Sequence, residues 1–173
     1  MLNEIADTVP ASPGLNSFRM NGCWDNNTVD QWPITQLANK TQNIKSLALE
    51  TFWEYRMPEA TRDRWLDLAG QICATSQQLE HLVVKNTATS AEQGLAFLQE
   101  LADSEVNTLK HIDLSGGKQV ILSKGNKQEF VDNKWFVGSP QEPVDLLVAA
   151  LTRQTYVEKL VLEYCPLTDA QKD

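Results

Sequence analysis

Apolar residues recur along this chain in one frame, at the first, fourth and sixth positions of a short segment. The frame occurs five times, in segments that start at Leu15, Ile44, Leu79, Leu109 and Val157. Successive starts are 29, 35, 30 and 48 residues apart. A unit of this size cannot bury its own apolar face, so units that repeat on this scale stack on one another. The pattern therefore predicts a stack of supersecondary units, and it favours binding over catalysis.

The segments between the frames have the spacing of helices. Leu98, Leu101 and Ala102 are three and four residues apart, and similar segments occur at residues 2–8 and 34–39. Such spacing marks one face of a helix. Further helices are expected to start at Pro58 and Pro143, because proline suits a first turn and each is followed by an early carboxylate. Each unit is thus predicted to be a strand followed by a helix, which gives an α/β fold with five parallel strands on a concave side and helices on the convex side. The alternative is a chance run of apolar triplets.

The extended frame resembles the leucine-rich repeat, L-x-x-L-x-L-x-x-N/C. Cys23 and Cys165 stand at the ninth position, and Cys165 opens a C-P-L-T-D segment. That segment is similar to the turn of the cysteine-containing and ribonuclease-inhibitor-like subclasses. The resemblance covers residues 2–169 and implies a leucine-rich repeat solenoid, with a single domain over residues 1–173. It does not select one function, since the family includes inhibitors, ubiquitin-ligase adaptors, GTPase activators and bacterial effectors.

The alternation of strand side chains predicts which residues face the concave surface. The fourth and sixth positions should point into the core, whereas the third, fifth and seventh should point away from it. Both signs of charge are mixed at these outward positions, which suits a protein partner better than a polyanion. The predicted partner-binding residues on this surface are Arg19, Glu50, His81, Lys85, His111, Asp113, Lys159 and Glu163.

The chain has two histidines, and both hold the third position, in consecutive units. Two imidazoles with Asp113 on the same face are zinc-ligand types. Surface histidines that make polar contacts explain the pattern equally, and we expect His81 and His111 to be neighbours without a structural metal. The segment L-S-G-G-K-Q at 114–119 is close to the signature of ABC-type ATPases, but the chain lacks a G-x-x-x-x-G-K-[ST] loop to hold phosphates. With no recognisable nucleophile motif, the sequence predicts no catalytic residue and no cofactor.

Large aromatic residues indicate two further parts of an interface. Trp24 and Trp53 hold the tenth position of consecutive units. Stacking would place them side by side, either as a binding ledge or as packing under the loops. The longest unit contains an insertion at 118–142, where apolar segments flank K-G-N-K and predict a β-hairpin. Trp135 and Phe136 in this insertion are expected to anchor a partner, and a disordered spacer is the alternative.

Charge and cysteine content restrict the partners and the compartment. The net charge is −8, from 15 basic and 23 acidic residues without a basic cluster, which argues against nucleic acid. Three cysteines suit the reducing cytoplasm or nucleus, although glycosylation triplets at Asn26 and Asn39 leave secretion open. No apolar run approaches the roughly 20 residues of a membrane helix.

Neither end shows an evident polar cap, so we expect the chain to belong to a longer array or to be capped by neighbouring chains. The function that we expect is a non-catalytic protein-protein interaction module. The alternative is the substrate-recognition or regulatory part of a larger enzyme, such as a ubiquitin-ligase adaptor or an effector.

Overall fold

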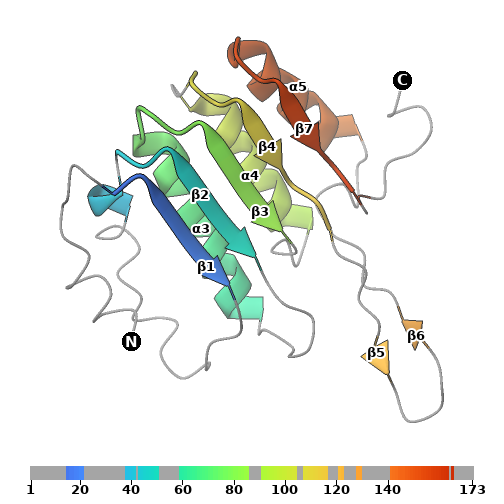
Figure 1. Cartoon of the computed structure of the whole chain (residues 1–173). Coiled ribbons are helices and arrows are strands. Elements are labelled where there is room, and N and C mark those ends of the chain that lie inside the picture. Colours follow the sequence, from blue (N-terminus) through green and yellow to red (C-terminus); the bar gives the residue numbers. More distant parts are fainter. Residues whose placement is uncertain are drawn as a thin grey trace.

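The computed structural model describes residues 15–21, 38–41, 43–50, 59–85, 91–104, 107–116, 121–122, 128–129, 141–163 and 165. Five strands within these ranges form one sheet in the order β1-β2-β3-β4-β7 (Figure 1). All adjacent pairs are parallel, so the predicted parallel sheet with one strand per frame is confirmed. The strands are β1 (Ser17–Asn21), β2 (Ser46–Glu50), β3 (His81–Lys85), β4 (His111–Asp113) and β7 (Lys159–Val161).

The strands pair in register with the frame. Ser17 pairs with Ser46, Ser46 with His81, His81 with His111, and His111 with Lys159. The third positions of all five units therefore form one row across the sheet. Since side chains alternate along each strand, every other position of the frame forms a row as well.

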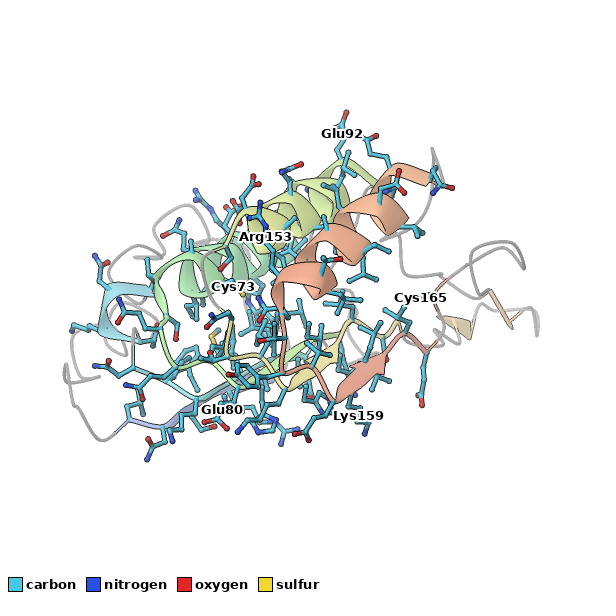
Figure 2. The ribbon with its side chains drawn as sticks, turned by 90° about the horizontal axis from the view of Figure 1, so that it is seen from above. Cys73, Glu80, Glu92, Arg153, Lys159 and Cys165 are labelled. Carbon is cyan, nitrogen blue, oxygen red and sulfur yellow. The ribbon has the colours of Figure 1, made fainter. Side chains whose placement is uncertain are left out.

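Helices cover one face of the sheet, as Figures 1 and 2 show. They include α3 (Glu59–Thr75), α4 (Ala91–Asp103) and α5 (Gln141–Arg153). Helix α3 begins directly after Pro58, as predicted. Helix α5 begins two residues before Pro143, so this proline lies in its first turn, where the missing N–H breaks no helical hydrogen bond. Each helix leads into the next strand, which gives the strand-then-helix units that the sequence predicted.

The core lies between the sheet and the helices. In the three middle units the fourth and sixth positions of the frame are all fully buried. On the helix side Trp65 is fully buried and Cys73 is nearly so. Figure 2 shows Cys73 between the two layers. The buried strand residues are Leu47, Leu49, Leu82, Val84, Ile112 and Leu114.

The last unit departs from this pattern. Leu160 holds the same fourth position in β7 and is 36% exposed, and Leu162 is only partly buried. The expectation of a buried fourth position is therefore wrong for this unit. The reason is that β7 is the last of the described strands in the sheet, and β4 is the one described strand that pairs with it.

The insertion contains a two-stranded antiparallel sheet, β5 (Ile121–Leu122) and β6 (Gln128–Glu129), which agrees with the predicted hairpin. In this sheet Ile121 pairs with Glu129 and Leu122 pairs with Gln128. The K-G-N-K turn lies outside the described residues. So do residues 1–14 and 166–173, on which the expectations about the ends of the chain rest.

Helices α3 and α4 meet at Gly70, where a carboxylate lies against the glycine. A Cβ at this position would be 1.5 Å from Oε2 of Glu100. Burial, and next the nearby Asp67, raise the pKa of the Glu100 carboxyl. The charged form of Glu100 is therefore disfavoured in the folded protein, and the absence of a side chain at Gly70 makes room for the carboxylate.

We expect Glu100→Gln to stabilise the protein at pH 7 by up to about 0.5 kcal/mol. The pKa of Glu100 is higher in the folded protein than its value near 4.5 in the unfolded chain. Wild-type stability therefore falls as the pH rises from 4.5 through the folded pKa. Below pH 4.5 the carboxyl is protonated in both states, so the advantage of glutamine should vanish there. Urea denaturation at pH 7 and pH 4 measures both effects. Glu92→Gln, in the first turn of the same helix, is the matched control and should not stabilise, since a carboxylate there favours the helix dipole. A loss of stability in Glu100→Gln at pH 7 would contradict this expectation.

Candidate functional site

The face of the sheet that points away from the helices carries the third, fifth and seventh positions of the frame, and we refer to it as the open face. Figure 2 shows Lys159 on this side of the sheet and Glu92 on the opposite side of the molecule, beyond the helices. The strand register brings the predicted concave residues together here from all five units. They are Arg19, Glu50, His81, Lys85, His111, Asp113, Lys159 and Glu163.

Four of these residues form ion pairs with one another between neighbouring strands. Nζ of Lys85 lies 2.7 Å from Oδ2 of Asp113, and Nη2 of Arg19 lies 3.1 Å from Oε2 of Glu50. The hydrogen bond to Asp113 raises the pKa of the Lys85 ammonium. A partner would therefore meet paired charges at these positions, and a pair that is already satisfied adds specificity more than affinity.

The structure places Asp113 in its predicted row but leaves it only 5% exposed. Its Oδ1 accepts a hydrogen bond of 3.0 Å from the backbone N–H of Ser115. Burial by itself raises the pKa of the carboxyl, but the hydrogen bonds from Lys85 and Ser115 outweigh it and hold the pKa below its ordinary value. Asp113 thus orients Lys85 and the chain after β4, and it presents little carboxylate surface to a partner.

The two histidines are neighbours on the open face, as predicted. Their ring centroids are 6.0 Å apart and the rings are tilted by 51°. His81 is exposed and His111 is partly buried. Burial, and next the charge of Lys159, lower the pKa of His111, so its imidazole is neutral at pH 7. Within the described residues no three His, Cys, Asp or Glu side chains form a group that could hold a metal ion.

A further row of charges lies at the second position of the frame, one residue before each of the strands β2, β3, β4 and β7. Nζ of Lys45 is 3.6 Å from Oε1 of Glu80, and Nζ of Lys110 is 2.8 Å from Oε2 of the same carboxylate. The hydrogen bond from Lys110 is the main reason that the pKa of Glu80 lies below its ordinary value. Glu158 continues the row, and its charge contributes to the raised pKa of Lys110. The sign of the charge therefore alternates from unit to unit. We call Lys45, Glu80, Lys110 and Glu158 the second-position row.

Sequence reasoning missed the second-position row because it considered only side chains that alternate within the strands. The signal was present, since Lys45, Glu80, Lys110 and Glu158 all stand directly before a third position. Only the stacking of the units shows that residues about one unit apart in the chain lie within ion-pair distance.

The cysteines in the described part of the chain are not nucleophiles. Burial raises the pKa of Cys73 to about 12 and that of Cys165 to about 11. Both thiols are therefore protonated at neutral pH, and the thiolate is the reactive form. Sγ of Cys165 lies 3.6 Å from the carbonyl oxygen of Leu114, so this ninth-position thiol bonds to the backbone of the preceding unit.

Four predicted partner-binding residues, Trp24, Trp53, Trp135 and Phe136, lie outside the described residues, as does Cys23. Of the helices in the described ranges, none has the length and apolar character needed to span a membrane. No protein-family model matches the chain, and a comparison with curated proteins finds no match.

Proposed function

We propose that the chain is a leucine-rich repeat module that binds another protein through the open face of its sheet. Two observations support the repeat assignment. The L-x-x-L-x-L frames pair unit by unit in one register, and the helices cover the opposite face of the sheet (Figure 2). A stack of this kind offers a broad surface, and such surfaces are typical of binding proteins.

We propose that the partner contacts the third-position row, which consists of Ser17, Ser46, His81, His111 and Lys159. The observation that supports this choice is the location of the row between two sets of paired charges. On one side of it the second-position row is neutralised by its own ion pairs. On the other side Arg19–Glu50 and Lys85–Asp113 are paired as well. Between these paired charges, His81 and Lys159 are exposed.

The chemistry of this row suits a protein surface with both donors and acceptors. A neutral imidazole can donate and accept a hydrogen bond, and the flat rings of the two histidines provide apolar contact area. Lys159 adds one cation at the end of the row. The aromatic residues Trp24, Trp53, Trp135 and Phe136 remain predicted anchors of the same interface.

We expect a His81→Ala, His111→Ala double variant to bind its partner about tenfold more weakly, as for truncated hot-spot residues. The full-length protein serves as bait in affinity capture, and quantitative mass spectrometry compares the recovered proteins. Both rings lie on the surface of the sheet, so thermal unfolding should show that the fold survives.

The matched control is a Glu92→Ala, Thr152→Ala double variant, whose residues are exposed on α4 and α5. A partner that depends on the open face is lost by the histidine variant and retained by the helix variant. If the two variants lose the same proteins equally, or if the histidine variant loses none, the open face is not the binding surface.

A further inference from the structure

Strand β7 is the last strand of the sheet in the described part of the chain, and no described strand pairs with its outer edge. The fourth-position residues of the middle units, Leu47, Leu82 and Ile112, are fully buried, whereas Leu160 of β7 is 36% exposed. The same unit also exposes Tyr156 by 60%. An edge strand with apolar side chains and unpaired backbone groups is a template for pairing with another strand.

The direction of the backbone groups in this strand shows which residues can accept such a partner. The N–H of Lys159 donates to the carbonyl of Lys110, and the carbonyls of Val161 and Glu163 accept from Leu114 and Gly116. Residues 159, 161 and 163 thus point their backbone groups toward β4. Strand β7 ends at Val161, and the bond to Glu163 continues the pairing with β4 for two more residues. Because backbone groups alternate along an extended segment, we infer that those of Leu160 and Leu162 point away from β4. The Leu162 carbonyl accepts a long turn bond of 3.4 Å from Cys165, and a carbonyl has a second lone pair.

We propose that a second copy of this chain pairs with the β7 edge as an antiparallel strand, about a two-fold axis perpendicular to the sheet. In the proposed register Leu160 lies opposite Leu162 of the second copy, and these two residues exchange hydrogen bonds. Val161 then lies opposite its own equivalent. Such an axis keeps the helices of both copies on the same side, so the exposed leucines of the two edges cover one another.

The charges of the strand favour this occupant over an unrelated one. In the same register Lys159 faces Glu163 of the second copy, and Glu163 faces its Lys159. Residues 159, 161 and 163 form non-hydrogen-bonded pairs in this arrangement, in which opposed side chains approach most closely. A segment with a cation at residue 159, where β7 begins, and an anion at residue 163, two residues after β7 ends, complements a reversed copy of itself. This is the condition for a closed two-fold dimer.

Sedimentation equilibrium tests the proposal on the full chain. The wild-type protein is expected to show about twice the 19.4 kDa mass of one chain. Lys159→Glu and Glu163→Lys should each raise the dissociation constant at least about tenfold, because each change places like charges opposite one another at two sites. Mixed in equal amounts, the two variants should recover dimers, since every opposed pair in the mixed dimer again has opposite signs.

The mixture also shows that each single variant is folded, because neither could otherwise restore association. Glu92→Lys changes an exposed charge on α4 and should leave the dimer intact. A wild-type chain that stays monomeric up to its solubility limit would overturn the proposal. So would single variants that remain dimeric, or a mixture that does not associate. A mass that keeps rising with concentration would indicate open-ended stacking by another unit and would also overturn the closed pair.

Discussion

Replacement of Leu82 by alanine is expected to lower the free energy of unfolding by about 3 kcal/mol, within the range measured for buried leucines. Leu82 is fully buried at the fourth position of β3, the central strand. Its register partners Leu47 and Ile112 belong to the two neighbouring units and are also fully buried. The cavity would therefore open between three units. Since these side chains are held by the strands on both sides, they cannot move far enough to fill the cavity.

Urea denaturation followed by circular dichroism measures this loss. The matched control is Val83→Ala, one residue further on the same strand, where the side chain is only partly buried and points to the open face. This change should cost less than about 1 kcal/mol. Equal losses at the two positions would show that the alternation of the frame does not define the core.

The second large effect is expected at Asp113. Asp113→Ala should lower the free energy of unfolding by about 1–3 kcal/mol, because it leaves the Ser115 N–H, which is buried, and the ammonium of Lys85 without their acceptor. Asp113→Asn should cost less, since an amide oxygen can still accept from Ser115. If Lys85→Met is combined with Asp113→Asn, the losses should be less than additive, because the two residues contact each other.

The Asp113 effect should also depend on pH. The folded pKa of this carboxyl is depressed, so it adds stability above its unfolded value of 3.8, and this stability is lost as the pH falls through the folded pKa. Wild type and Asp113→Asn should therefore differ at pH 7 and converge well below pH 3.8. Denaturation curves at both ends of this range provide the measurement. A difference that stays constant in acid would mean that the charge of Asp113 does not stabilise the fold.

Much of the fold was predictable from local pattern. An apolar residue at the fourth and sixth positions places both side chains on one face of an extended strand, whatever lies beside it. Proline and an early carboxylate favour the start of a helix for reasons that act within one turn. These signals predicted the five strands and the start of α3 after Pro58.

The setting of the charged residues was not predictable in the same way. The alternation of side chains along the strand predicted that Asp113 is exposed. Asp113 is instead buried, and it forms an ion pair with Lys85 of the neighbouring strand β3. The same reasoning predicted that Leu160 is buried, but it is 36% exposed. Among the described strands, β4 alone pairs with its strand β7. Both outcomes depend on what the adjacent unit supplies, and a single frame carries no information about its neighbour.

The sequence by itself determined the strand-and-helix unit, the repeat of that unit and the two faces of the sheet, because each follows from the periodicity of side chains along one short segment. Only the tertiary structure decided which charged side chains form ion pairs and which of the described strands stand at the two ends of the sheet. Arg19 and Glu50 are 31 residues apart in the chain, and Lys110 and Glu80 are 30 apart. Electrostatic interaction at a few ångströms requires the strands to stack in one register first, so these pairs exist only once the units have assembled.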